Sequence, residues 1–135
     1  MLAQAEVLGG LLRAHNNHNA ADFAACFAPN GVLRVIPTGE AAQGREQIKA
    51  FLKPQFRAFP DWHIERRGLY DCGATIWVEW MVTGTHAGEL LGHAATHRGV
   101  ELRGCSSFRF TSDGLLAVED LYFDPATMLR QLGLL

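Results

Sequence analysis

The second half of the chain alternates apolar and polar residues with the period of β-strands. An Asp-Gly pair at 113–114, flanked by two such runs, is a strong short-range signal for a β-hairpin. We expect these two runs to pair antiparallel, with Phe110 opposite Leu115 across a four-residue turn. Upstream of the turn this register gives the pairs Phe108–Ala117, Ser106–Glu119 and Gly104–Leu121. The predicted strands are Trp62–Tyr70, Thr75–Thr83, Val100–Phe110 and Leu115–Phe123.

The beginning of the chain spaces its apolar residues with the period of a helix. A first helix is predicted from Leu2 to His15, and one of its faces carries Leu8, Leu11, Leu12 and His15. Asn19 is suited to cap a short second helix that carries Phe23 and Phe27 one turn apart.

Two further helices are predicted, one in the middle of the chain and one at its end. Gly44 to Phe59 has a helical pattern, and Pro54 is expected to end or kink this helix near Lys53. After the last strand, Asp124 can cap a helix whose first residue is Pro125.

A turn at residues 29–31 and a short strand from Val32 to Ile36 complete the predicted elements. Helical segments combined with long antiparallel strands predict an α+β fold. The chain has 135 residues and shows no internal repeat or linker, so we expect one domain over residues 1–135.

The composition is typical of a soluble globular protein, with 48% apolar residues and a net charge of −2 at pH 7. A charge this small gives no attraction to nucleic acid or to an anionic membrane, so neither is an expected partner. No apolar run approaches the roughly 20 residues that span a bilayer, and the N-terminus lacks the basic start of a signal peptide. Three cysteines without CxxC spacing predict free thiols and a cytoplasmic location.

The predicted strand Thr75–Thr83 is apolar on both faces. One face carries Ile76, Val78, Trp80 and Val82, and the other carries Trp77 and Met81, with only Glu79 charged. An antiparallel strand with one wet face would alternate apolar and polar residues. Helices can cover one face, and we expect a second copy of the chain to cover the other in a homodimer.

The histidines do not have the spacing of a metal site. His15 and His18 lie three residues apart in an Asn-rich segment, where solvated histidines at a helix end are the simpler interpretation. His86, His93 and His97 lie in a Gly-rich segment that is expected to form a mobile hairpin tip. The sequence contains no P-loop, no GxGxxG motif and no Ser-His-Asp arrangement. We therefore expect no metal and no cofactor.

Several segments, spread over nearly the whole chain, resemble the SnoaL-like group of the nuclear-transport-factor-two-like superfamily. They are GREQIKAFL, AFPDW, TGTHAGELLG, RGCSSFRFTSDG, EDLYFDP and LRQLG. Ketosteroid isomerase and limonene epoxide hydrolase are relatives of this group. The resemblance implies a cone-shaped, strongly bent antiparallel or mixed sheet wrapped around the N-terminal helices, with an apolar cavity. It does not define the function, because the superfamily includes cyclases, isomerases, hydrolases and non-catalytic domains.

The acidic residues that serve catalysis in these relatives are missing at the matching positions. The base and the oxyanion hole of ketosteroid isomerase correspond to Ile36, Leu12 and Ser106. The catalytic aspartate of the SnoaL cyclases corresponds to Leu121. The Asp-Arg-Asp set of limonene epoxide hydrolase corresponds to Ile76, Val78 and Leu121. The resemblance therefore implies the scaffold of the family with an altered or absent catalytic set.

Glu119 is the remaining candidate for chemistry, because strand alternation places it on the face of Leu121 and Ser106. In an apolar cavity, desolvation would raise the pKa of Glu119 and suit it to accept a proton near neutral pH. A cyclase, isomerase or hydrolase would then use Glu119 for proton transfer on an apolar carbonyl compound, with Ser106 orienting a polar atom. The residues expected to line the pocket are Leu12, Ile36, Leu52, Val78, Trp80, Phe108, Leu121 and Phe123.

Two alternatives stay open. Glu119 could be the structural partner of Arg103, Arg98 or another cation at the cavity rim. The chain could also be a non-catalytic ligand-binding or structural module of the same fold. A second polar group that converges on Glu119 would favour an enzyme, because one carboxylate cannot both abstract a proton and stabilise the resulting oxyanion. Asp120 is expected on the opposite face, in solvent or at an interface.

Overall fold

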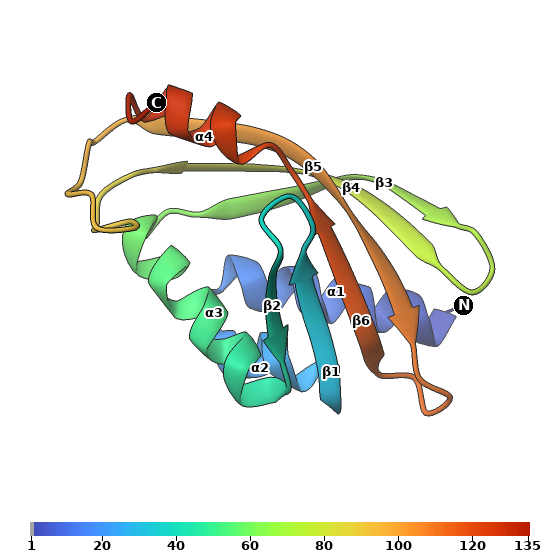
Figure 1. Cartoon of the computed structure of the whole chain (residues 1–135). Coiled ribbons are helices and arrows are strands. Elements are labelled where there is room, and N and C mark those ends of the chain that lie inside the picture. The colour runs from blue at the N-terminus through green and yellow to red at the C-terminus, as the bar shows by residue number, and fades with distance from the viewer. Residues whose placement is uncertain (1) are drawn as a thin grey trace.

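Six strands pair into one mixed sheet in the computed structural model, which describes residues 2–135 (Figure 1). Their order in space is β2-β1-β6-β5-β4-β3. Neighbouring strands are antiparallel except β1 and β6, which run parallel. The strands are β1 (Phe27–Val35), β2 (Glu40–Gln43), β3 (His63–Asp71), β4 (Ile76–Thr85), β5 (Gly99–Phe110) and β6 (Leu116–Tyr122).

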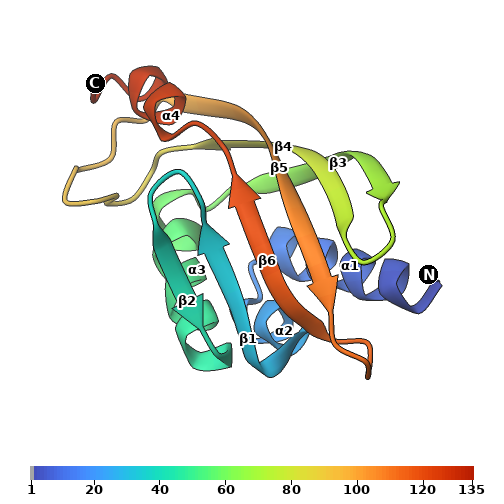
Figure 2. The same ribbon diagram turned by 45° about the vertical axis from the view of Figure 1, so that its right-hand side comes forward.

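Three helices lie on the concave side of the curved sheet, namely α1 (Leu2–Asn16), α2 (Ala20–Ala25) and α3 (Arg45–Ala58) (Figures 1 and 2). The fourth helix, α4 (Pro125–Gln131), lies beside β5, where the Gln131 amide exchanges two hydrogen bonds of 2.9 Å with the Glu101 backbone. No helix within residues 2–135 is both long and apolar enough to cross a membrane. The prediction of an α+β fold with a bent sheet around N-terminal helices is confirmed.

The inner face of the sheet, which is the face toward α1 and α3, forms the hydrophobic core. In β4 the four apolar residues of this face are each at most 8% exposed: Ile76, Val78, Trp80 and Val82. They belong to one cluster with Leu8 and Leu11 of α1 and with Ile48 and Leu52 of α3. Full burial of a large apolar side chain stabilises a fold by about 1.5–3 kcal/mol, so this contact holds the helices against the sheet.

Both predicted helix caps are confirmed. The side chain of Asn19 accepts a hydrogen bond from the Asp22 backbone N–H at 3.0 Å, and that of Asp124 accepts one from Ala126 at 3.1 Å. Pro54, in contrast, does not end α3, which continues to Ala58. Pro54 is exposed and removes one backbone donor, whereas buried residues on both sides of it hold the helix against the sheet.

The strand β1 is longer than predicted, and its partner β2 was not predicted. Residues 29–31 were expected to form a turn but lie within β1, where pairing with β6 is irregular between Phe27 and Val32. A Cβ at Gly31 would lie 2.8 Å from the Leu116 carbonyl oxygen, so glycine permits the close approach of the two strands. The four residues of β2 are too few to show a period.

The predicted hairpin of β5 and β6 forms, but the predicted register was wrong by two residues. Ser106 lies opposite Leu121 rather than Glu119, and Phe108 lies opposite Glu119. The expected pair of Gly104 and Leu121 is therefore also wrong.

Two local features cause this difference, and each shifts the register by one residue. The turn closes between Thr111 and Leu115, with a backbone hydrogen bond of 2.8 Å, so its loop has three residues instead of four. Ala117 then stays unpaired as a bulge, because Arg109 pairs with Val118 and Phe110 pairs with Leu116. A shift of one residue turns side chains to the other face, and a second shift restores them. Glu119 therefore shares the inner face with Ser106, as predicted.

Candidate functional site

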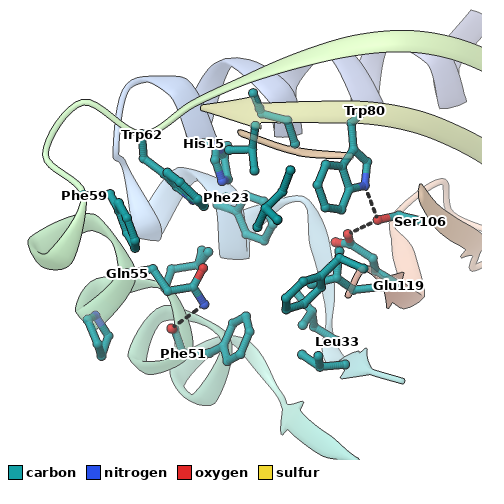
Figure 3. A pocket seen from close by; sticks show the side chains of 18 of the residues that line it. His15, Phe23, Leu33, Phe51, Gln55, Phe59, Trp62, Trp80, Ser106 and Glu119 are labelled. Carbon is teal, nitrogen blue, oxygen red and sulfur yellow. Dashed lines mark hydrogen bonds between the residues drawn. The ribbon is translucent and has the colours of Figure 1, made fainter. Parts of the chain in front are cut away.

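A cavity of about 710 Å³ lies between the inner face of the sheet and the helices α1 and α3 (Figure 3). This volume is within the usual range for small-molecule sites. Most of the wall is apolar, and it includes Leu8, Leu11, Phe23, Leu33, Val35, Phe51, Phe59, Trp62, Ile64 and Met128. Residues 89–92, in the connection between β4 and β5, contribute a further part of the lining.

The structure places seven of the eight predicted pocket residues around this cavity: Leu12, Leu52, Val78, Trp80, Phe108, Leu121 and Phe123. Ile36 is the exception, because it is 42% exposed and does not line the cavity. Leu33 and Val35 point inward from β1, so the next residue along the chain points away. The prediction for Ile36 was wrong by one position at the end of the strand.

Three polar side chains of the inner face form a hydrogen-bonded chain (Figure 3). The indole Nε1–H of Trp80 donates to Ser106 Oγ at 3.1 Å, and the Ser106 hydroxyl donates to Glu119 Oε2 at 2.9 Å. These residues come from β4, β5 and β6, which are adjacent in the sheet. The hydrogen of the Ser106 hydroxyl is thus directed at the carboxyl group of Glu119.

Gly104 makes room for the indole ring of Trp80, the first donor of this hydrogen-bonded chain. It pairs with Trp80 across β4 and β5, and a Cβ at this position would lie 2.4 Å from two carbons of the Trp80 ring. The same Cβ would lie 2.5 Å from the carbonyl oxygen of Tyr122. The indole ring can thus lie against the backbone of β5, close to Ser106.

The carboxyl group of Glu119 is almost completely enclosed, with 6% of the residue exposed. Its Oε1 atom is buried and has no hydrogen-bond partner among residues 2–135. Burial raises the pKa of Glu119 to about 7, the hydrogen bond from Ser106 opposes this shift, and the charge of Asp120 adds to it. Glu119 is therefore present in both protonation states near neutral pH.

The ion-pair alternative for Glu119 is not realised. Among residues 2–135 no salt bridge includes Glu119, and neither Arg98 nor Arg103 approaches it as a partner. The neighbouring Asp120 points to the outer face and forms the ion pair instead. Its carboxylate accepts hydrogen bonds from Arg34 Nε at 2.6 Å and from Nη2 at 2.8 Å.

His15 is a second polar group of the cavity wall, and the sequence interpretation missed it. It was expected in solvent at a helix end, but it lines the cavity beside Phe23 and Phe56. Its Nδ1 atom is buried without a hydrogen-bond partner within the described residues. Burial lowers the pKa of His15 to about 4, against a smaller opposing effect of the Asn16 side chain, so the imidazole is neutral at pH 7.

The signal that could have identified His15 was its position on the helix. It follows Leu8, Leu11 and Leu12 on the apolar face, and this periodicity is a stronger indication of burial than the polar residues that follow it. His18 also differs from the expectation of a solvated side chain. Its Nε2 lies 2.8 Å from the carbonyl oxygen of Trp62, and its ring stacks on Phe56.

The three histidines between β4 and β5 lie in different environments. His86 is fully buried against Phe59, and its Nδ1 accepts a hydrogen bond from the Thr96 backbone N–H at 3.1 Å, so it is not part of a mobile tip. His93 and His97 are exposed. Over residues 2–135, no three His, Cys, Asp or Glu side chains are close enough together to hold a metal ion. His86 therefore has a structural position in this connection.

Comparison with known proteins relates the chain to one family. The family model described as a SnoaL-like domain matches residues 9–119. No curated protein sequence matches the chain.

Three solved structures illustrate the likeness in fold. AclR from Streptomyces galilaeus, a proposed hydroxylase, is 20% identical, with a TM-score of 0.86 over 100% of this chain and 98% of its own. IdmH from Streptomyces antibioticus, a proposed polyketide cyclase, is 24% identical, with a TM-score of 0.79 over 96% and 98% of the two chains. A protein from Catenulispora acidiphila DSM 44928 with a ketosteroid isomerase-like fold, in complex with trimethylamine, is 18% identical, with a TM-score of 0.81 over 96% and 94%. At these identities the likeness shows the fold alone.

Proposed function

Because the chain belongs to the SnoaL-like domain family, we propose that its cavity binds an apolar, carbonyl-bearing small molecule and that Glu119 transfers a proton on it. The observation that carries this proposal is the enclosed carboxyl group of Glu119. It lies in an apolar wall, and among residues 2–135 it has no cationic partner and keeps one oxygen without a hydrogen bond. An unpaired buried carboxyl group destabilises a fold. We therefore expect Glu119 to have a function that outweighs this cost, such as acting on a ligand.

The arrangement of the polar chain supports Glu119 as the acid–base group. Ser106 holds Oε2, and Oε1 is buried without a partner, so the carboxyl group must turn toward the cavity for Oε1 to meet the ligand. In the proposed step the ionised Glu119 removes a proton from a carbon next to the carbonyl group. The C–H bond breaks, its electron pair passes into the enolate, and the resulting carboxylic acid returns the proton to the same or another carbon. A pKa near 7 suits both directions of this transfer.

A second function, ligand binding without chemistry, is favoured by one observation. Trp80 and Ser106 are the donors next to Glu119, and both hydrogens are already used in hydrogen bonds, that of Trp80 to Ser106 and that of Ser106 to Glu119. Neither hydrogen is therefore free to stabilise an oxyanion on the ligand. The experiment must distinguish binding from proton transfer.

Hydrogen–deuterium exchange distinguishes the two functions. With 4-acetylbiphenyl in D₂O, wild-type protein should speed deuterium incorporation into the acetyl methyl group, measured by NMR, while tryptophan quenching measures binding. Glu119→Gln should lower the catalysed rate by about 100-fold or more and retain binding, because a positioned acid–base group contributes about 10²–10⁴-fold. Asp120→Asn is the matched control and should exchange like wild type. Binding without catalysed exchange in the wild type would support the non-catalytic function.

A further inference from the structure

The proposed function uses the β6 side of the cavity and gives no role to His15. Glu119 extends from β6 and His15 extends from α1, and the two side chains lie well apart in Figure 3. Both line the same cavity. Apolar and aromatic side chains form most of the wall around them, including Phe23, Trp62 and Val78.

The surroundings of His15 do not explain its presence as a packing residue. Its ring lies near two aromatic rings, with centroid distances of 6.3 Å to Phe23 and 5.6 Å to Phe56. Nδ1 has no hydrogen-bond partner among residues 2–135, so the ring gains no compensation for its desolvation at that atom. A leucine at this helical position would avoid the desolvation. A ligand in the cavity cannot supply the missing partner of the enclosed Nδ1, so the nitrogen that it would meet is Nε2, which is not buried without a partner as Nδ1 is.

The enclosure of Nδ1 also indicates which hydrogen-bonding group His15 can offer. A neutral imidazole carries one proton, on either Nδ1 or Nε2. A buried N–H without an acceptor is disfavoured more strongly than an unused lone pair. The proton therefore belongs on Nε2, so a ligand atom that meets this nitrogen would be an acceptor such as a hydroxyl, ether or carbonyl oxygen.

The charges around the cavity indicate an uncharged ligand at this end. Apart from Glu119, the Asp, Glu, Lys and Arg residues that line the cavity are exposed: Glu40, Arg57, Arg66 and Glu89. A ligand cation or anion beside His15 would lie among aromatic rings and a neutral imidazole. Burying an unpaired charge in such surroundings is costly.

We propose that His15 is the second polar contact of the bound molecule, which makes the ligand an elongated, uncharged compound with an acceptor oxygen remote from the group at Glu119. This inference rests on the proposed function, because it assumes that the ligand occupies the cavity with its carbonyl end at Glu119. His15 then selects among apolar ketones by the substituent at their far end.

Three matched probes test this inference: 4-acetylbiphenyl, its 4′-hydroxy derivative and its 4′-methoxy derivative. Wild-type protein should bind both oxygen-bearing probes about fivefold more tightly than 4-acetylbiphenyl, the effect of one neutral hydrogen bond. His15→Leu should abolish this preference without weakening the binding of 4-acetylbiphenyl. His15→Gln keeps an N–H donor and should restore part of the preference. Dissociation constants from tryptophan quenching or calorimetry give the ratios.

His18→Asn is the control, because His18 is the neighbouring histidine that does not line the cavity, and asparagine tolerates its positive φ of 55°. It should keep the preference of the wild type. A purely structural His15 would change the melting temperature and leave the ratio of the affinities unchanged. Equal binding of all three probes to the wild type, or an unchanged ratio in His15→Leu, would overturn this inference alone. Failure of every probe to bind would overturn the proposed ligand class together with it.

Discussion

Glu119 and Asp120 are adjacent on β6, yet their carboxyl groups lie in opposite environments. Glu119 is enclosed on the inner face, receives one hydrogen bond from Ser106 and has a pKa of about 7. Asp120 lies on the outer face, where Arg34 binds both of its oxygens. The alternation of a β-strand therefore decides which of two similar side chains faces the cavity and which is an ion-pair partner.

The comparison also shows that the two groups affect stability in different ways. The side chain of Arg34 is 49% exposed, so its pair with Asp120 contributes little, about 1 kcal/mol or less. Glu119 in contrast opposes folding whenever it is ionised, because the native state favours its neutral form. Glu119 is therefore the carboxyl group that lowers the stability of the fold, and carboxyl groups with a strongly raised pKa are concentrated at functional sites.

The largest expected effect concerns the outer face and changes the mass of the particle. Trp77 and Met81 lie on the outer face of β4 and are only half-buried, and Trp77 lies 5.8 Å from Tyr122 between ring centroids. We expect a second copy of the chain to cover this surface, giving twice the chain mass in sedimentation equilibrium at micromolar concentration. Trp77→Glu should shift the particle to the monomer, and Asp120→Asn, on the same face, should not. Wild-type protein that sediments as a monomer would contradict the predicted dimer.

The next effect is a change of the unfolding free energy with pH, to which two groups of the cavity contribute with opposite signs. The pKa of Glu119 is about 7 in the fold and 4.5 in the reference state, so this group lowers the unfolding free energy as pH rises from 4.5 to 7. The pKa of His15 is about 4 against a reference of 6.5, so His15 raises the unfolding free energy as pH rises from 4 to 6.5. Each contribution amounts to about 3 kcal/mol, and in the wild type they largely cancel.

Single substitutions should expose these contributions. From pH 4.5 to 6.5, the unfolding free energy of Glu119→Gln should rise relative to wild type by about 2–3 kcal/mol, and that of His15→Leu should fall by a similar amount. Urea unfolding of the three proteins at each pH measures the differences, in which the other titrating groups cancel. Parallel pH profiles would show that neither group is enclosed as described.

A smaller effect is expected from a methyl group at Gly104, which would disturb the inner face only. Gly104→Ala should lower the unfolding free energy by about 1–3 kcal/mol, because the new Cβ would overlap the Trp80 ring and the Tyr122 carbonyl group. The nearest atom to a Cβ at Gly99, on the same strand, is 4.0 Å away, so Gly99→Ala is the control. Equal denaturation midpoints for the two variants would contradict the described contact.

The smallest effect should come from the ion pair of the outer face. Asp120→Asn should lower the unfolding free energy by about 0.5–1 kcal/mol at low salt, and the difference from wild type should shrink as salt is added. Chemical denaturation in buffers of low and high ionic strength measures it. A loss of several kcal/mol that is insensitive to salt would mean that Asp120 is the more important carboxylate of the two.

The sequence predicted the face of Glu119 although its predicted partner was wrong. The hairpin signal at Asp113-Gly114 and the alternation along β6 are local properties, and local patterns determine which face a side chain occupies. The turn length and the bulge at Ala117 depend on how β5 and β6 curve together, which no local pattern reveals. The turn length and the bulge each shifted the register by one residue, and a shift of two residues leaves side chains on their predicted face. The sequence therefore predicted that Ser106 and Glu119 share a face, but it did not predict which residues pair.

Ile36 and His15 show the two ways in which the pocket prediction failed. Ile36 follows the last residue of β1, where one position decides between cavity and solvent, and strand ends cannot be located to one residue from sequence. His15 was judged by its polar neighbours in sequence, whereas its environment is set by α1 packing over the sheet. A buried polar residue breaks the pattern of an apolar face, and such breaks are expected at functional sites.

The hydrogen bond from Trp80 to Ser106 gives the protein a chromophore of its own inside the cavity. The indole ring is 8% exposed and is separated by one hydroxyl group from a carboxyl group that titrates near neutral pH. Of the three tryptophans of the sequence, Trp80 is the one hydrogen-bonded to Ser106, so we expect its share of the emission to follow the ionisation of Glu119. The same hydrogen-bonded chain that orients the acid is thus an optical indicator of its charge state, and no external label is needed to read it.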